Sequence, residues 1–390
     1  MNPVIFSLGP LQMTWYGLLI VFGAVIAAYI SIFEAKRRGE DPEHIWNMLA
    51  WILIFGIIGA RLYHVFSNPV GGLGWSWYRE HPIDIIAFWN GGFRGLGIFG
   101  AVLGGFLAIV LYIFFFNRRQ AKRRAEAKAL LLRYSTEVGP DLVQKILSAD
   151  ISTIPGLTAQ RERVDLLRQR IETIEGWDAA RLVELADVFA ERSSGLFGIL
   201  SGGRQKRVAE ATELLKNNEG VVGKDLVQAV LAGDVSTRAG RAAQKERVAG
   251  LTSRLTQAKG YAAGKLATLA GVFAERKMIV SRWLDVVTPG ILLAQAIGRM
   301  GNYINQELYG PPTTLPWGFK INPKFPFQPP TEMLGKTQDE VLNYIAATRF
   351  HPTFFYEALW NLVGFGLVMW LGRKWYHKLR DGDLILFYLI

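Results

Sequence analysis

The sequence predicts an all-α membrane protein in which several transmembrane helices flank a soluble helical insert. Half of the 390 residues are hydrophobic, and 12 Trp and 23 Phe are more than the core of an ordinary soluble domain needs. Apolar stretches close to the length that a bilayer requires recur near both ends of the chain. The middle of the chain has no such stretch and carries charged residues at helical spacing instead.

A hydrocarbon core about 30 Å thick needs roughly 20 mostly apolar helical residues. Stretches of this kind lie at about residues 13–33, 45–66, 95–116, 286–303 and 354–371. The N-terminal stretch lacks the basic region and cleavage site of a signal peptide, so we expect it to stay as the first span. The last apolar residues, LILFYLI, begin a sixth span that is too short to cross, and we expect the chain to be truncated there.

Basic residues cluster after three of the five spans: Lys36, Arg37 and Arg38 after the first, Arg118, Arg119, Lys122, Arg123 and Arg124 after the third, and Arg373, Lys374, Lys378 and Arg380 after the fifth. Cytoplasmic loops are enriched in Lys and Arg. The pattern therefore predicts an N-terminus outside the cell, a cytoplasmic insert, and outward-facing segments at about 67–93 and 310–351.

The predicted insert, residues 118–280, separates an N-terminal transmembrane half at 1–117 from a C-terminal half at 281–390. Its net positive charge contributes to the +11 of the whole chain. Nucleic acid is one partner that this charge suggests. A basic helix is more often a solvated face beside anionic lipid, so we do not expect nucleic acid to be a partner.

The insert contains an internal repeat. DLVQKILSADIST, which begins at Asp141, returns as DLVQAVLAGDVST at Asp225, and DVFAER returns as GVFAER, each 84 residues later. A unit this small buries its apolar face better against a neighbour. We therefore expect two tandem helical units, at about 138–192 and 222–276, docked on each other.

The chain has no cysteine, which excludes disulfides, thiolate metal sites and a cysteine nucleophile in the protein itself. Ionisable groups inside spans are costly and usually face a polar cavity. Arg61 is one such group, although an arginine near a helix end also snorkels or holds a carbonyl. Glu357 is another. The segment GRMGNYINQELYG brings four polar residues to one depth: Arg299, Asn302, Asn305 and Glu307.

This polar cluster suits an anionic phosphodiester headgroup. A guanidinium binds phosphate oxygens, and carboxamides bind glycerol hydroxyls. A purely structural polar knot explains the spacing equally well.

The same segment resembles the signature G-R-x-G/A-N-F-x-N-x-E-x-x-G of the prolipoprotein diacylglyceryl transferases, from which only Tyr303 departs. Further segments are similar to the family in the same order along the chain. They are WYG at 15–17, GARLYHV at 59–65, WNGG at 89–92, LPWG at 315–318 and HPTFFYE at 351–357. The resemblance covers about 1–117 and 278–390 and does not extend to the insert.

The resemblance implies an enzyme of the bacterial inner membrane that moves the diacylglyceryl group of phosphatidylglycerol to the lipobox cysteine of a prolipoprotein. Glycerol-1-phosphate is released, and neither a cofactor nor a metal is expected. The expected partners are phosphatidylglycerol, lipobox-containing prolipoproteins and membrane lipid.

The family also implies roles for single residues. Arg299 is expected to stabilise the phosphate as it gains charge, with Asn302 and Asn305 positioning the headgroup and Glu307 orienting Arg299. Arg299, Asn302 and Glu307 form the expected catalytic set. The other expected substrate-binding residues are Tyr16, Arg61 and Gly310. Tyr16 and Tyr356 are expected to line the lipid cavity, and a packing role explains each equally well.

One expected feature of the family is missing. Members carry a histidine in the glycine-rich loop after WxGG, whereas Leu96 or Phe99 stands there in this chain, and neither accepts a proton. Arg94 in that loop either lowers the pKa of the substrate thiol or meets lipid phosphate. His351 is an alternative base, although we expect it to cap the following helix.

Two other functions stay open at this point. A catalytically silent relative that binds phospholipid or lipoprotein precursors would keep the Arg299 motif and explain the missing histidine. A membrane-anchored interaction protein would instead act through its cytoplasmic insert. Salt-dependent binding of nucleic acid by the insert would favour the second.

Overall fold

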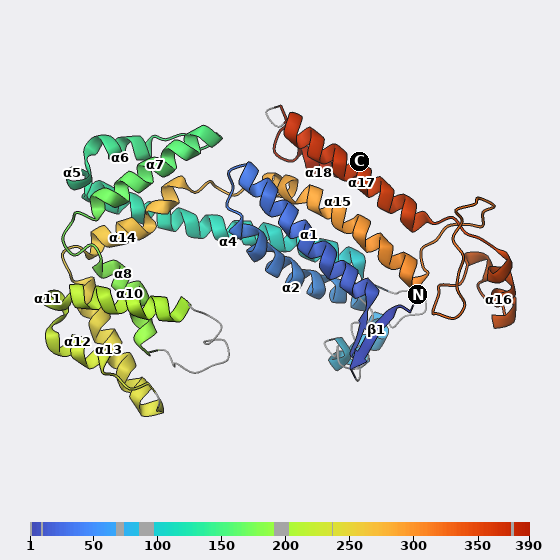
Figure 1. Cartoon of the computed structure of the whole chain (residues 1–390), viewed down its shortest axis with the longest axis horizontal. Helices are drawn as coiled ribbons and strands as arrows, with labels where there is room; N and C mark the ends of the chain where they lie inside the picture. The colour runs from blue at the N-terminus through green and yellow to red at the C-terminus, as the bar shows by residue number, and fades with distance from the viewer. Residues whose placement is uncertain are drawn as a thin grey trace. The chain divides into compact units, whose positions relative to one another are not determined.

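The computed structural model describes residues 2–8, 11–67, 74–85, 97–190, 203–235, 237–375 and 378–390. They form two compact units (Figure 1). One comprises Met1–Phe116 with Met278–Ile390, and the other is Asn117–Lys277. Helices dominate both units, which confirms the predicted all-α class.

The first unit begins with a short hairpin that the all-α prediction did not include. Strands β1 (Val4–Leu8) and β2 (Leu11–Thr14) pair antiparallel. The side chain of Thr14 accepts a hydrogen bond from the backbone N–H of Gly17 at 3.1 Å and so caps the first helix. The first helix therefore begins at Trp15, and the residues before it are free to pair as strands.

The long helices of the first unit follow the predicted spans closely. They are α1 (Trp15–Arg37), α2 (Glu43–Phe66), α4 (Ile98–Arg133), α15 (Val280–Asn305) and α17 (Thr353–Lys374), and α4 continues into the second unit. The shorter ones are α3 (Trp75–Glu80), η1 (Pro82–Ile85), η4 (Thr331–Met333), α16 (Gln338–Ala347) and α18 (Asp383–Leu389).

The second unit consists of short helices. They are α5 (Ser135–Val138), α6 (Pro140–Leu147), α7 (Ile154–Ile171), α8 (Ala179–Leu185), η2 (Ala186–Ala190), α10 (Gly203–Asn217), α11 (Glu219–Val222), α12 (Lys224–Leu231), α13 (Arg238–Thr256), α14 (Tyr261–Leu269) and η3 (Ala270–Ala274).

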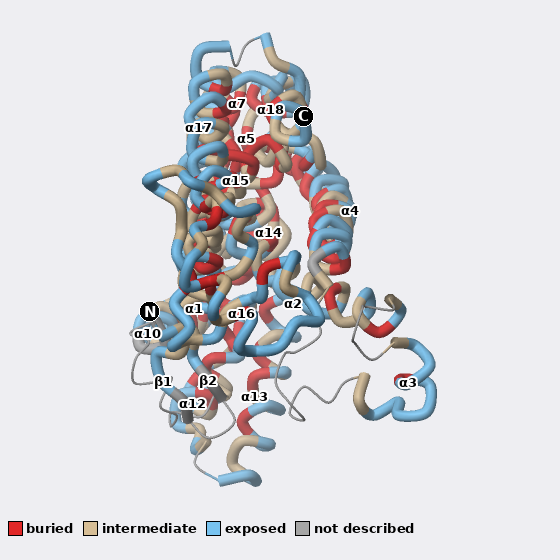
Figure 2. Tube along the Cα trace, turned by 90° about the vertical axis from the view of Figure 1, so that its right-hand side faces the viewer, coloured by how far each residue is buried: buried red, intermediate tan, exposed pale blue. Residues whose placement is uncertain are grey.

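Among the described residues, α1, α2, α4 and α17 are long and apolar enough to cross a membrane. Large apolar side chains stay exposed on them, including Val21 at 61%, Phe22 at 54% and Trp360 at 75%. Figure 2 shows the exposed residues along α17. Apolar faces of this extent mark contact with lipid or another apolar partner.

Helix α15 does not belong to this apolar set, because charged residues such as Arg282, Asp285 and Arg299 interrupt it. It contacts α1 along one side and α17 along another. A Cβ atom on Gly290 of α15 would lie 2.6 Å from the carbonyl oxygen of Ala27, so the α1 and α15 backbones nearly touch. That α15 spans the membrane remains a prediction.

The core of this unit lies where α1, α2, α4 and α15 meet. It is built from buried side chains that include Ile45, Met48, Ile113, Trp283 and Val286. A second contact holds α18 to α15, because buried Asp285 accepts hydrogen bonds from the backbone N–H groups of Gly382 at 2.8 Å and Ile385 at 2.9 Å. The polar start of α15 thus fixes the last described helix.

Helices α2 and α4 approach each other through glycines. A Cβ atom on Gly100 would lie 2.1 Å from the carbonyl oxygen of Gly59, and one on Gly104 would lie 2.2 Å from that of Phe55. Small residues permit this backbone approach, and dispersion forces between the closely packed helices then stabilise the pair. No larger residue fits at these positions without separating the helices.

A matched pair of substitutions tests this contact. We expect Gly104→Ala to lower the free energy of unfolding by about 1–3 kcal/mol, because its methyl group meets backbone atoms that cannot move aside. Gly105→Ala in the same helix serves as the control, since its nearest neighbour would be the Ile52 side chain at 3.4 Å. Thermal unfolding in detergent measures both. Equal midpoints for the two variants would contradict the close α2–α4 packing.

Candidate functional site

The polar motif of the sequence lies at the C-terminal end of α15 and in the turn that follows. Gln306 caps the helix in the left-handed conformation, with φ 53°. Its buried side chain donates hydrogen bonds to the carbonyl oxygens of Asn322 at 3.0 Å and Pro326 at 3.2 Å. The helix end is therefore fixed to the segment between α15 and α17.

Glu307 holds the two asparagines of the motif. Its Oε1 accepts one hydrogen bond from Nδ2 of Asn302 at 3.0 Å and another from Nδ2 of Asn305 at 3.1 Å. A carboxamide has a second N–H hydrogen and a carbonyl oxygen beyond the bond made here. The carboxylate thus sets the orientation of two amides that still have capacity for a ligand.

Arg299 forms an ion pair with Glu357, at 2.6 Å between Nη2 and Oε2. We expected Glu307 to orient Arg299, but the carboxylate that pairs with the guanidinium is that of Glu357 in α17. The side chains of Arg299 and Glu357 are 36% and 48% exposed. An ion pair this accessible contributes little to stability, and an anionic ligand can compete for the guanidinium.

Tyr16 from the start of α1 joins this cluster. A Cβ atom on Gly301 would lie 2.3 Å from Cδ2 of Tyr16, so the phenol ring packs directly on this glycine. The Tyr16 hydroxyl interacts electrostatically with both Glu307 and Arg299. Tyr16 can therefore lie beside the charged groups only because residue 301 has no side chain.

A cavity of about 870 Å³ opens at the end of α15 and the start of α17. Its lining comes from α15, α17 and the segment between them: Met300, Tyr303, Trp317, Gly318, Phe319, Lys320, Pro352, Phe354, Phe355, Tyr356 and Leu359. The rings of Phe319 and Phe354 meet edge to face at 5.3 Å, and both contact Tyr303. The cavity is lined mostly by apolar side chains, and the polar cluster comes from residues next to the lining residues in the sequence.

Gly310 at the end of the motif packs against the start of α17. Its N–H donates a hydrogen bond to the carbonyl oxygen of His351 at 2.8 Å, and a Cβ atom here would lie 2.7 Å from Cγ2 of Thr353. His351 was expected to cap this helix, but the cap residue is Pro352. The His351 ring instead lies 3.3 Å from the hydroxyl of Tyr356, which also accepts a hydrogen bond from the Trp317 indole at 3.0 Å.

Arg61 has a different environment. Its guanidinium donates to the carbonyl oxygens of Ile85, at 2.9 Å, and Asp84, and it stacks over the ring of Tyr78. These contacts hold α3 and η1 against α2, as expected for an arginine that satisfies neighbouring carbonyls. Its assignment to substrate binding stays a prediction.

Several expected residues lie outside the part of the chain that the structure describes, and one contributor was missed. Arg94, Leu96 and the WNGG segment lie outside the described residues. Phe99 lies on α4, with its ring 5.8 Å from that of Tyr63. Gln306 was not among the residues that the sequence singled out. Glu357 was singled out by its charge within an apolar stretch, but its pairing with Arg299 was not expected. Within the described residues, no three His, Asp or Glu side chains are grouped to hold a metal ion.

The chain matches the family model described as prolipoprotein diacylglyceryl transferase over residues 3–130 and 260–390. It is similar to the phosphatidylglycerol–prolipoprotein diacylglyceryl transferase of Chloroflexus aggregans, at 24% identity over 386 residues, which cover 97% of this chain and 68% of that protein.

Shorter alignments have higher identity. The transferase of the same name from Bifidobacterium adolescentis is 45% identical over 108 residues, covering 27% of this chain and 30% of that protein. The one from Limosilactobacillus reuteri is 38% identical over 112 residues, covering 29% and 38%. This chain therefore spans about two thirds of the Chloroflexus protein, and the alignments cover less than two fifths of the other two. No solved structure matches.

The two glycines of the GRMG segment should differ in their tolerance of a side chain. Gly301→Ala is expected to lower the unfolding midpoint, because the methyl group collides with the Tyr16 ring. Gly298→Ala should leave the midpoint unchanged or raise it slightly, because no atom would lie within 4 Å of the new Cβ and alanine favours helix. Thermal unfolding in detergent compares them. Similar losses in both variants would place Tyr16 elsewhere.

Tyr309 allows a pH test of the segment that follows the motif. Burial, with the charge of Glu332 adding to it, raises the pKa of Tyr309 from 10.0 to about 12. Its hydroxyl donates to the carbonyl oxygen of Gln328. The neutral hydroxyl therefore contributes its full stability below pH 10, and this contribution is lost as the pH rises toward 12. Unfolding midpoints should fall across that range more in the parent than in Tyr309→Phe; parallel curves would contradict the raised pKa.

Proposed function

The chain belongs to the prolipoprotein diacylglyceryl transferase family, and we propose that it transfers the diacylglyceryl group of phosphatidylglycerol to the lipobox cysteine of a prolipoprotein. The observation that carries this proposal is the Arg299–Glu357 ion pair beside the two asparagines held by Glu307. An accessible guanidinium next to oriented amides suits a phosphate esterified to glycerol.

In the proposed reaction, negative charge develops on the leaving phosphate, next to the Arg299 guanidinium. The substrate thiol gives up its proton to water, and the sulfur attacks the carbon of the diacylglyceryl group that bears the phosphate. A C–S bond forms, the C–O bond breaks, and glycerol-1-phosphate leaves with the electron pair. Negative charge grows on the leaving phosphate, so the guanidinium of Arg299 stabilises the transition state more than the ground state.

The other residues of the site have supporting roles in this proposal. Glu357 positions the Arg299 side chain before substrate binds, and the phosphate then takes the place of the carboxylate. Asn302 and Asn305 bind the glycerol hydroxyls of the headgroup, oriented by Glu307. Tyr16 and the aromatic wall that includes Tyr356 enclose the lipid, while Gly301 and Gly310 permit the close packing that aligns these groups.

The four apolar helices and the family together indicate a membrane protein. We propose the bacterial inner membrane as its location, with the N-terminus outside and the insert in the cytoplasm. The Lys and Arg residues at the C-terminal ends of α1 and α17 support this orientation. The Arg299 cluster, near the opposite ends of these helices, would then lie where exported precursors emerge.

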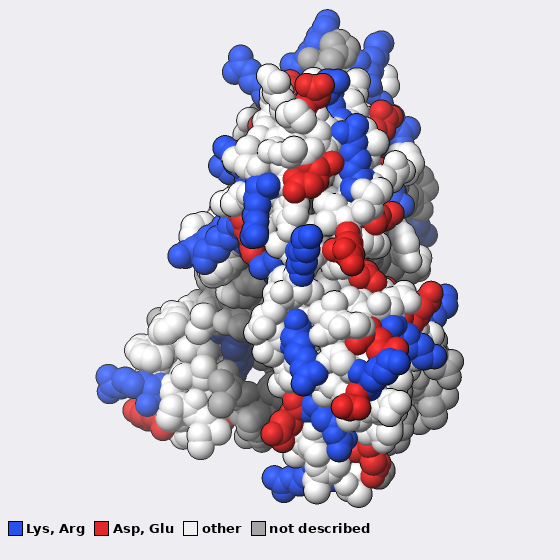
Figure 3. All heavy atoms as spheres, turned by 90° about the vertical axis from the view of Figure 1, so that its left-hand side faces the viewer, with Lys and Arg blue, Asp and Glu red and all other residues white. Residues whose placement is uncertain are grey.

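The insert offers little support for a nucleic-acid partner. Figure 3 faces the side on which Figure 1 draws the insert helices, and Lys and Arg there are interspersed with Asp and Glu. Several pairs of opposite charge are in contact, such as Arg168 with Asp165 and Arg181 with Glu184. Nucleic-acid binding instead favours a continuous surface of positive charge.

Transfer of radiolabelled diacylglyceryl from phosphatidylglycerol to a lipobox peptide tests the proposal. Membranes containing Arg299→Ala should lose about 10²–10³-fold in rate, the usual loss when one charge-stabilising donor is removed. Arg299→Lys should recover part of the rate, since it keeps the charge but not the forked geometry. Arg161→Ala, an exposed arginine of the insert, is the control and should not change the rate. Equal rates for Arg299→Ala and parent would refute the assignment.

Glu357→Gln separates positioning from direct chemistry. It keeps the side-chain size but removes the negative charge that pairs with Arg299, so kcat should fall while the KM for phosphatidylglycerol changes little or decreases. A carboxylate with a purely structural role would instead lower the unfolding midpoint and leave kcat of the folded fraction unchanged.

A further inference from the structure

The helices of the insert occur as two sets with one spacing. Helices α5, α6, α7 and α8 are followed 84 residues later by α11, α12, α13 and α14, and η2 by η3. The last turns of α4, which end at Arg133, correspond in the same way to α10, which ends at Asn217. Residues 119–190 are called the first copy below, and residues 203–274 the second copy.

The two copies share their internal hydrogen bonds as well as their helices. Nε2 of Gln160 donates to the carbonyl oxygen of Ile146 at 2.9 Å, and Nε2 of Gln244 donates to that of Val230 at 2.7 Å. Both glutamines are almost completely buried. A buried amide is costly unless it is bonded, so a shared bond of this kind indicates a shared local structure.

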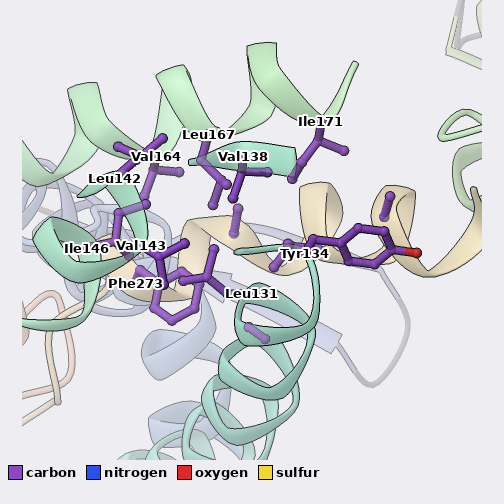
Figure 4. Packing of buried hydrophobic residues seen from close by; sticks show 14 of the residues in the cluster. Leu131, Tyr134, Val138, Leu142, Val143, Ile146, Val164, Leu167, Ile171 and Phe273 are labelled. Atoms are coloured by element: carbon purple, nitrogen blue, oxygen red, sulfur yellow. The ribbon is translucent and has the colours of Figure 1, made fainter. Parts of the chain in front are cut away.

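Each hydrophobic core nevertheless takes side chains from both copies. In the first core, residues of the first copy between Ala127 and Ile171 surround five residues of the second: Ala263, Leu266, Ala270, Val272 and Phe273. Figure 4 shows Phe273 among Leu131, Val143 and Ile146. In the second core, residues of the second copy surround five of the first: Ala179, Leu182, Leu185, Ala186 and Val188. The last helices of each copy thus complete the core of the other.

Ion pairs repeat this exchange on the surface. Nε of Arg181 in the first copy lies 2.8 Å from Oε1 of Glu210 in the second. At the equivalent positions, Lys265 of the second copy pairs with Glu126 of the first. Copies that folded on themselves would pair Arg181 with Glu126 and Lys265 with Glu210. Both pairs therefore join different copies, in reciprocal fashion.

Equivalent residues also meet each other where the two copies cross. Gly176 and Gly260 occupy the same position in the two copies, and a Cβ atom on Gly176 would lie 3.4 Å from the backbone nitrogen of Gly260. The exchanged helices touch close by, because a Cβ atom on Gly264 of α14 would lie 2.9 Å from Cβ of Ala180 in α8. Contact between equivalent residues is the mark of an isologous, two-fold interface.

We infer that the 84-residue unit is a self-pairing module whose binding partner is a second copy of itself. The surface that accepts a partner is formed by the first helices of the unit, and the segment that binds it is the last pair of helices. In this chain the two partners lie in one polypeptide, so the insert is a fused, helix-exchanged pair. Exchange of identical elements is a low-cost route to such pairs.

The exchange also determines how the insert is closed. Nε2 of Gln120 donates to the carbonyl oxygen of Arg276 at 3.1 Å, and Arg123 pairs with Glu275 at 3.3 Å. The start and the end of the insert are therefore held together, next to the core that contains α14 and η3. That core contains side chains of both copies, so the contacts that hold the two ends together lie beside a core that both copies build.

The absence of cysteine from the chain makes cross-linking a direct test on the full-length protein. We expect a short bis-maleimide to link the cysteines within one chain in each of two variants. One carries Arg181→Cys with Glu210→Cys, and the other carries Glu126→Cys with Lys265→Cys. The control pair is Arg181→Cys with Glu126→Cys, which joins residues of the same copy and should react much less. Mass spectrometry of proteolytic peptides identifies the links. Preferential linking of the control pair would overturn the exchange.

Deletion of residues 179–262, which removes 84 residues and joins Asp178 to Ala263, tests self-pairing between chains. The shortened chain keeps one accepting surface and one set of last helices. It should dimerise in detergent, with Glu126→Cys on one chain linking to Lys265→Cys on a differently tagged chain. A monomer with this link formed only within one chain would show that the unit closes on itself, and would overturn self-pairing.

Discussion

The constraint on which the first unit depends is that α15 carries charged side chains near both ends, and each of them needs a polar partner. Asp285 near its start bonds the backbone before and within α18, and Arg299 near its end pairs with α17. Between these ends the helix lies against α1 and α17, and glycines let the backbones approach closely. The neighbouring helices satisfy the polar groups of α15, so they can present their own apolar faces outward.

The same arrangement accounts for the form of the site. A guanidinium, a carboxylate and two amides lie at one end of a packed helix, and an apolar cavity opens at the same end. A phospholipid has this combination of properties, with an anionic headgroup and apolar chains. The exposure of the Arg299–Glu357 pair matters here, because a fully buried pair would resist exchange with a phosphate. The site thus combines a fixed set of amides with a cation that a ligand can take over.

The insert follows a different principle. Each of its two hydrophobic cores is completed by helices from the other copy. Reciprocal burial joins the two copies into one compact unit, and contacts between its two ends close the insert. Because the ends of the insert are held together, the loop-closure entropy lost in joining α4 to α15 is small despite the length of the insert.

The sequence by itself determined the all-α class and the positions of the apolar helices, because a bilayer dictates length and apolarity locally. It also located the polar motif, since charged and amide residues are rare in such surroundings. The hairpin at Val4–Thr14 was missed because strand pairing there depends on where Thr14 starts α1. Only the tertiary structure decided that Glu357 pairs with Arg299 and Glu307 with the asparagines, and that Arg61 contacts α3 and η1. The 84-residue spacing was visible in the sequence, but the exchange of helices was not, since copies of similar sequence can pack on themselves or on each other with the same local pattern.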